Sequence, residues 1–175
     1  MKKILIIGAG RSSSSLIKYL LENAEKEHWH VVVGDLDLDL AKSKIKGFDR
    51  GEAIRFDASN HDFVIQKISE NDLIISMLPA SMHVSIAEEC VKQKKHLLTP
   101  SYVSPQMTSL DQKAKDAGVL LMNELGVDPG IDHMSAKRVL DKIEKEGGKM
   151  ICFESFTGGL VAPESDDNVW NYKFT

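Results

Sequence analysis

The sequence has few cysteines, no long apolar run and no excess of basic residues. Only two cysteines, Cys90 and Cys152, occur among the 175 residues; we expect two buried thiols rather than a disulfide, and no metal site. Apolar runs such as Ile4–Ile7 are far shorter than the roughly 20 residues of a membrane-spanning helix. The formal net charge is −4 and the lysines are scattered, which argues against a nucleic-acid partner. With neither a membrane segment nor a signal peptide, we expect a cytoplasmic protein.

Short β-branched runs alternate with amphipathic stretches along most of the chain. Runs that are apolar throughout are typical of parallel strands, which are buried on both faces, and six occur: Ile4–Ile7, Val31–Val33, Ala53–Phe56, Leu73–Met77, Leu97–Thr99 and Val119–Met122. Apolar residues at three- and four-residue spacing predict helices between them, over 13–26, 39–46, 61–70, 80–94 and 105–117. Ser104, before Pro105, and Gly118 have the residue types of caps at the two ends of the last of these helices. The repetition of strand and helix predicts an α/β fold with a doubly wound parallel sheet.

The pattern changes near the end of the chain. A helix is predicted over about 130–146, for which Asp128 is a candidate N-cap. The stretch KMICFESFTGG then predicts a strand, and a second is predicted by the alternation of Trp170, Tyr172 and Phe174. We therefore expect a nucleotide-binding domain at 1–148, and at 149–175 the start of an incomplete second α/β domain.

The turn GAGRSSSS after the first predicted strand has the pattern of a dinucleotide-binding loop. Gly8 allows the tight turn, and Gly10 lets the backbone approach a pyrophosphate. Ser13 occupies the third glycine position, where a small side chain is needed for packing against the sheet. Arg11 and Ser12 lie at the start of the helix, whose N-terminus would receive the phosphate charge.

An acidic residue, Asp35, ends the second predicted strand. A carboxylate at this place accepts hydrogen bonds from the ribose hydroxyls of NAD and repels the 2′-phosphate of NADP. The sequence therefore predicts NAD as the cofactor and disfavours NADP. The alternative is that Asp35 caps the next helix, but Asp37 and Asp39 are better placed for that role.

Residues after the later strands should lie at the same edge of the sheet, where ligands bind in such folds. Four follow the fourth strand and are expected beside the nicotinamide: Ser76, Met77, Leu78 and Pro79. Ser101 and Tyr102 follow the fifth strand, and their hydroxyls can donate to a bound carboxylate or carbonyl, with packing as an alternative role for Tyr102. Asp128 is either a site residue or only an N-cap, and His133 is either structural or catalytic.

Three segments, TPSYVSP, NELGVDPGIDHM and SFTGGLVAPESDDN, closely resemble the saccharopine dehydrogenase family, in particular its glutamate-forming branch. The resemblance implies an NAD(P)-dependent oxidoreductase of lysine metabolism, with a Rossmann domain and an α/β substrate domain. It implies that hydride leaves the carbon beside the bridging nitrogen of saccharopine, and that water hydrolyses the imine to glutamate and 2-aminoadipate 6-semialdehyde. It also implies a small amino-acid substrate, and we expect a homodimer in the complete protein.

The resemblance assigns roles to individual residues. The glycine turn matches the family's phosphate loop. The implied chemistry needs proton transfers, for which Tyr102 and Asp128 are the nearest candidates. The implied substrate-binding residues are Ser101, Tyr102, Asp128, Thr157 and Gly158. Thr157 stands where fungal members have a cysteine, and those members use NADP, against which Asp35 argues.

Two alternatives remain open at this point. One is a related enzyme, of the carboxynorspermidine or lysine 6-dehydrogenase type, and the other is a non-catalytic NAD-binding module. Because the substrate pocket is expected to be incomplete, we also expect the 175-residue chain to bind cofactor without turnover.

Overall fold

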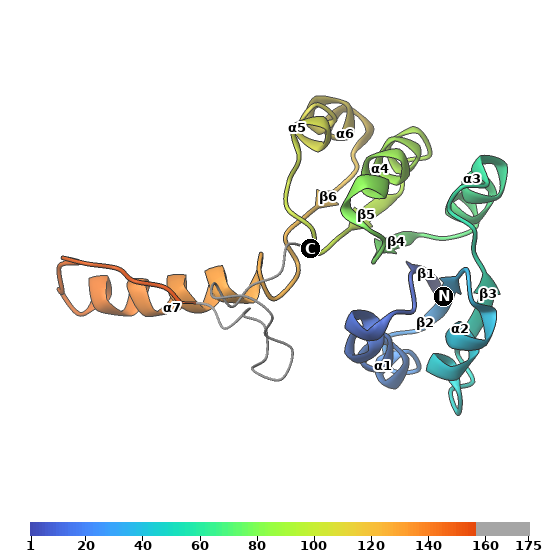
Figure 1. Ribbon diagram of the computed structural model, residues 1–175, viewed down its shortest axis with the longest axis horizontal. Coiled ribbons are helices and arrows are strands. Elements are labelled where there is room, and N and C mark those ends of the chain that lie inside the picture. Colours follow the sequence, from blue (N-terminus) through green and yellow to red (C-terminus); the bar gives the residue numbers. More distant parts are fainter. Residues whose placement is uncertain (157–175) are drawn as a thin grey trace, which may run out of the picture. The chain divides into compact units, whose positions relative to one another are not determined.

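The computed structural model describes residues 1–156, in which six parallel strands form one sheet. The strand order is β3-β2-β1-β4-β5-β6 (Figure 1), the order of a doubly wound dinucleotide-binding fold. The strands are β1 (Lys2–Ile7), β2 (Trp29–Asp35), β3 (Gly51–Arg55), β4 (Leu73–Ser76), β5 (His96–Leu98) and β6 (Leu121–Met122). The predicted fold class and the positions of all six strands are confirmed.

Helices connect successive strands and begin close to the predicted residues. They are α1 (Ser14–Asn23), α2 (Leu38–Ile45), α3 (His61–Ser69), α4 (His83–Lys92), α5 (Pro105–Thr108), α6 (Asp111–Ala117) and α7 (Ile131–Lys145). Short 3₁₀ turns, η1 (Arg11–Ser13) and η2 (Ala80–Met82), precede α1 and α4. The helix predicted over 105–117 is divided into α5 and α6. Met107 of α5 and Leu110 in the break are both buried and belong to one core cluster.

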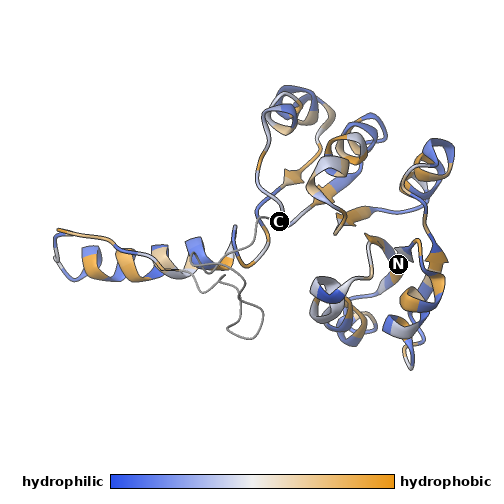
Figure 2. Cartoon of the chain, in the orientation of Figure 1, coloured by the Kyte–Doolittle hydropathy of each residue, from blue (hydrophilic) through white to orange (hydrophobic). Residues whose placement is uncertain are grey.

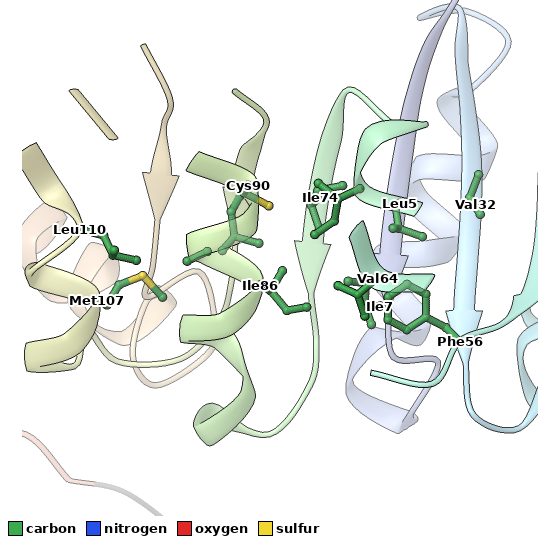
Figure 3. Packing of buried hydrophobic residues seen from close by; sticks show 13 residues of the cluster. Leu5, Ile7, Val32, Phe56, Val64, Ile74, Ile86, Cys90, Met107 and Leu110 are labelled. Atoms are coloured by element: carbon green, nitrogen blue, oxygen red, sulfur yellow. The ribbon is translucent and has the colours of Figure 1, made fainter. Parts of the chain in front are cut away.

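The sheet carries a hydrophobic core on each face, because side chains along a strand alternate between the two faces. Leu5 and Ile7 of β1 belong to a core with residues of α3, α4 and α5 (Figure 3). Ile4 and Ile6 belong to the other core, which includes residues of α1 and α2. Hydrophobic residues accordingly concentrate on the strands and the inner helix faces (Figure 2). Covering both faces is what an all-parallel sheet requires.

Two of the sequence signals for helix ends correspond to observed caps. The Ser104 hydroxyl accepts a hydrogen bond from the Met107 backbone N–H at 3.1 Å, which caps α5. Gly118 follows α6 in the left-handed conformation, with φ of 67°. Single capping residues in the sequence therefore predict where α5 begins and where α6 ends.

The end of the described chain differs from expectation. Residues 149–156 carry no regular secondary structure, so the strand predicted there is wrong for its described part, and Cys152 is exposed rather than buried. A strand needs a neighbour for its backbone hydrogen bonds, and the described residues offer none here. Thr157, Gly158 and the strand predicted around Trp170 lie outside the described residues.

The chain divides into two compact units, residues 1–135 and 136–175. The predicted domain boundary after residue 148 stays a prediction. Within residues 1–156, no helix is both long and apolar enough to cross a membrane.

Candidate functional site

The glycine turn after β1 is held tightly against two neighbouring strands. Gly8 has φ of +108°, and a Cβ there would lie only 3.0 Å from the Met77 backbone oxygen. Its N–H donates to the Gly34 carbonyl at 2.7 Å. Gly10, in contrast, has no atom within 4 Å of the place a Cβ would take. The turn thus needs glycine at position 8 for folding and has free space at position 10.

Ser13 fills the third position of the motif as predicted. It is fully buried, and its hydroxyl donates to the Gly10 carbonyl at 2.8 Å. Arg11 and Ser12 in η1 are exposed. The small, buried residue and the exposed start of the helix are the features that a pyrophosphate-binding turn requires.

A pocket of about 240 Å³ opens beside this turn, at the carboxyl ends of β1 and β2. Gly8, Asp35 and Leu78, three of the predicted cofactor residues, line it together. Leu36 and Phe56 add apolar walls, so the pocket offers a surface on which a flat ring can pack. The fold brings residues from distant parts of the sequence to one place next to the glycine turn.

Both carboxylate oxygens of Asp35 accept hydrogen bonds from the protein backbone. Its Oδ2 accepts from the Ala9 N–H at 2.6 Å, and its Oδ1 accepts from the Asp37 N–H at 3.0 Å. Asp37 caps α2 by accepting from Asp39 and Leu40, as the sequence indicates. Asp35 therefore ties the glycine turn to the turn that follows β2.

Asp35→Ala is expected to lower the free energy of unfolding by about 1–3 kcal/mol, because two backbone donors lose a charged acceptor. Urea unfolding of the 175-residue chain measures this change. Asp39→Ala is the matched control, since the side chain of Asp39 pairs only with exposed Lys42 among the described residues and such pairs contribute about 0–1 kcal/mol. Equal losses in the two variants would contradict the anchoring role.

Tyr102 and Asp128, which the sequence proposes as site residues, are in direct contact. The Tyr102 hydroxyl donates to Asp128 Oδ1 at 2.5 Å. This hydrogen bond, followed by smaller effects, raises the pKa of Tyr102 above its ordinary value. Tyr102 is 61% exposed, so it does not pack in the hydrophobic core of the described residues. Asp128 is not the N-cap of α7 either, since that helix begins only at Ile131.

A buried histidine, His83, which the sequence did not predict as a site residue, contacts the predicted site residues Ser76 and Ser101. His83, the first residue of α4, is 2% exposed and contacts Ser76 and Ser101 through opposite ring nitrogens. Burial lowers the pKa of His83, which favours the neutral form of the ring. The spacing of His83 in the sequence could have indicated that it is buried. It stands three, four and seven residues before Ile86, Ala87 and Cys90, which are buried on the same face of α4.

His133 is separate from this network. Its Nδ1 contacts Asp132 Oδ1 at 2.8 Å on the exposed surface. The hydrogen bond to Asp132 raises the pKa of His133, and the same pair lowers the pKa of Asp132 against its own desolvation. No hydrogen bond or ion pair in the described residues joins His133 to Tyr102 or Asp128, although the charge of Asp128 also raises the pKa of His133.

The fold and the site together define a dinucleotide-binding α/β protein of the dehydrogenase class. Two family models match the chain, "Saccharopine dehydrogenase NADP binding domain" over residues 4–122 and "Saccharopine dehydrogenase C-terminal domain" over residues 126–175. The chain belongs to the saccharopine dehydrogenase family, as the resemblance predicts.

Proteins of this family match the chain along its whole length. A saccharopine dehydrogenase (NADP⁺, L-glutamate-forming) of Pyricularia oryzae is 38% identical over 99% of this chain and 38% of its own length. A mitochondrial alpha-aminoadipic semialdehyde synthase of Bos taurus is 32% identical over 99% of this chain and 18% of its own. The structure of apo saccharopine dehydrogenase (L-Glu forming) from Saccharomyces cerevisiae has a TM-score of 0.81 and 33% identity, over 100% of this chain and 38% of that chain. The chain therefore spans less than two-fifths of the length of these relatives.

These findings overturn the prediction of NAD as the cofactor. The matching domain is an NADP-binding domain, and the fungal relative is named for NADP⁺. The structure gives Asp35 a second role, because its carboxylate accepts hydrogen bonds from the N–H groups of Ala9 and Asp37. An acid at this position can therefore serve the fold, and its presence alone does not select NAD over NADP. The mitochondrial relative leaves the cytoplasmic location a prediction.

Proposed function

We propose that this chain is the cofactor-binding part of an NADP-dependent, glutamate-forming saccharopine dehydrogenase. The observation that carries the proposal is the Tyr102–Asp128 pair, which follows β5 and β6 in a fold whose glycine turn follows β1. A proton-transfer pair at the edge where the cofactor binds is what oxidation of an amine requires. The names of the relatives support saccharopine as the proposed substrate.

NADP⁺ supplies a hydride acceptor when bound. The neutral secondary amine of saccharopine loses hydride from the carbon beside its nitrogen, which leaves an iminium ion. Water adds to the iminium carbon, and in this scheme Asp128 accepts the proton that the added water releases, which leaves a neutral carbinolamine. The carbon–nitrogen bond then breaks as the nitrogen gains a proton and the hydroxyl loses one, giving glutamate and 2-aminoadipate 6-semialdehyde.

Tyr102 is the proton donor of the pair. Its pKa is raised by the hydrogen bond to Asp128, so the phenol stays protonated at neutral pH. It returns a proton to the nitrogen as the carbon–nitrogen bond breaks. Ser101, adjacent in the chain, would donate a hydrogen bond to a substrate carboxylate, while the substrate-binding roles of Thr157 and Gly158 stay predictions outside the described residues.

The cofactor would lie along the glycine turn. The open space at Gly10 and the buried Ser13 fit a pyrophosphate at the start of α1. Met77, Leu78 and Pro79 would line the nicotinamide side, whereas Ser76, predicted there with them, is fully buried. Arg11, exposed in η1, is the cation that we assign to the phosphates, which Arg recognises through paired N–H donors.

Calorimetric titration of the 175-residue chain tests the cofactor. NADPH is expected to bind more tightly than NADH, and Arg11→Ala is expected to weaken NADPH binding about tenfold or more. Lys18→Ala is the matched control, because Lys18 is an exposed cation of α1 that pairs with Glu22. Tighter binding of NADH would contradict the assignment.

Steady-state turnover with NADP⁺ tests the reaction. The complete protein is expected to oxidise saccharopine, whereas this chain alone is expected to bind cofactor without turnover. If the protein instead prefers carboxynorspermidine or lysine as its substrate, the proposed reaction is wrong and the protein is a related dehydrogenase. Cofactor binding by the complete protein without turnover of any of the three substrates would overturn it in favour of a non-catalytic module.

A further inference from the structure

The buried ring of His83 joins the carboxyl ends of β4 and β5. Its Nδ1 lies 2.9 Å from the hydroxyl of Ser76, the last residue of β4. Its Nε2 lies 2.8 Å from Ser101 Oγ and 2.9 Å from Thr99 Oγ1, both just beyond β5. Ser76, His83 and Thr99 are each at most 2% exposed. One rigid ring thus fixes the spacing between two strand ends at the site.

The network also reaches the glycine turn. Ser76 pairs with Ile7 in the sheet register, and Ile7 directly precedes Gly8. The Met77 N–H donates to the Ile7 carbonyl at 2.8 Å. Ser101 is therefore linked, through His83 and Ser76, to the strand end that positions the cofactor loop.

The tautomer of His83 decides what the Ser101 hydroxyl can do. A neutral imidazole has one N–H and one lone pair, while a hydroxyl both donates and accepts. With the proton on Nε2, the ring donates to the oxygens of Ser101 and Thr99, and Nδ1 accepts from the Ser76 hydroxyl. The Ser101 proton then stays free to donate to a ligand. With the proton on Nδ1, the single lone pair of Nε2 accepts from one of the two hydroxyls, so Ser101 competes with Thr99 to donate to the ring, and its proton is lost to a ligand whenever Ser101 is the donor.

We propose that His83 is a positioning residue whose Nε2–H holds the oxygen of Ser101, so that the Ser101 hydroxyl donates to a carboxylate of the amino-acid substrate. The proposal rests on the proposed function, because Ser101 has this role only in a substrate pocket. Ser76 accepts no proton from the ring in this arrangement and instead donates to Nδ1. Neither His83 nor Thr99 touches the substrate.

The first test is ¹⁵N NMR of the histidine rings in the 175-residue chain, with His83→Gln for assignment. The expected signature at pH 7 is a neutral ring with the proton on Nε2. A ring protonated on Nδ1 alone, or a charged ring, would overturn the proposal. This measurement needs no turnover and is independent of the proposed reaction.

The second test uses kinetics of the active enzyme. His83→Leu is expected to raise KM for saccharopine about tenfold and to change the dissociation constant of NADPH less than about twofold. His83→Gln keeps a donor amide and is expected to recover part of the loss. His61→Gln, at the exposed start of α3, is the control and should change neither constant.

A double-mutant cycle with Ser101→Ala separates positioning from general damage. If His83 acts through Ser101, a substitution of His83 should add little to KM once the serine hydroxyl is gone. Fully additive effects, or equal losses of cofactor and substrate affinity, would refute the proposal. If His83→Leu does not fold, the cycle with His83→Gln decides. Failure of the wild-type enzyme to oxidise saccharopine would instead refute the proposed function, and the assignment of Ser101 with it.

Discussion

Asp128→Asn is expected to lower kcat for saccharopine oxidation by about 10²–10⁴-fold, the usual effect of losing a proton-transfer group. Asparagine keeps the size of aspartate and can still accept the Tyr102 hydroxyl, but it cannot take up a proton at neutral pH. Steady-state assays of the active enzyme measure the change. Asp111→Asn is the matched control, since Asp111 is an exposed acid on α6 that pairs with Lys115, and its kcat should equal that of the wild type.

Removing the acceptor altogether has a consequence that needs no turnover. The hydrogen bond to Asp128 is the largest cause of the raised pKa of Tyr102. Ultraviolet titration of the 175-residue chain should therefore show that Asp128→Ala, which abolishes this hydrogen bond, brings the pKa of Tyr102 back toward its ordinary value of 10.0. Tyr102→Phe identifies the signal, and Tyr19→Phe serves as the exposed control. An unchanged titration would contradict the contact itself.

Gly8→Ala is expected to abolish measurable NADPH binding and to destabilise the chain by about 1–3 kcal/mol, the cost of a non-glycine residue in a strained backbone conformation. Alanine at position 8 would have to adopt a φ of +108°, and its Cβ would lie 3.0 Å from the Met77 backbone oxygen. Neither can be relieved without moving the glycine turn away from β4. Urea unfolding and NADPH titration measure the two effects.

Gly10→Ala separates folding from binding at the same turn. Gly10 has φ of −61° and no atom within 4 Å of a new Cβ, so stability should change by less than about 0.5 kcal/mol. NADPH binding should still fall, because the methyl group would occupy the space through which the pyrophosphate approaches the backbone. A Gly10→Ala chain that binds NADPH as the wild type does would show that the cofactor does not contact this turn.

Much of the fold follows from local signals in the sequence. Apolar runs such as Ile4–Ile7 predict buried parallel strands because both faces of such a sheet are covered. Ser104 and Gly118 predict helix ends because capping depends on one or two neighbouring residues. The strand predicted after residue 148 is wrong in its described part, because a strand requires a partner that local sequence cannot supply.

The candidate site was only partly predictable. Tyr102 and Asp128 were found by motif, but their hydrogen bond joins residues 26 positions apart and depends on how β5 and β6 bring their loops together. His83 was missed because a histidine on the apolar face of a helix resembles any core residue until its partners are known. The wrong cofactor prediction arose because the charge of Asp35 is visible in the sequence whereas its hydrogen-bond partners are not.

The sequence by itself determined the parallel α/β fold, the glycine turn with its small third residue, and membership of the saccharopine dehydrogenase family, since each depends on residue type and spacing along the chain. The tertiary structure alone decided which polar groups are already engaged with one another. Asp35 accepts from the Ala9 and Asp37 backbone, and His83 links Ser76 to Ser101. The physical reason is that a hydrogen bond depends on distances of about 3 Å between atoms, and folding sets these distances between residues that are remote in the sequence.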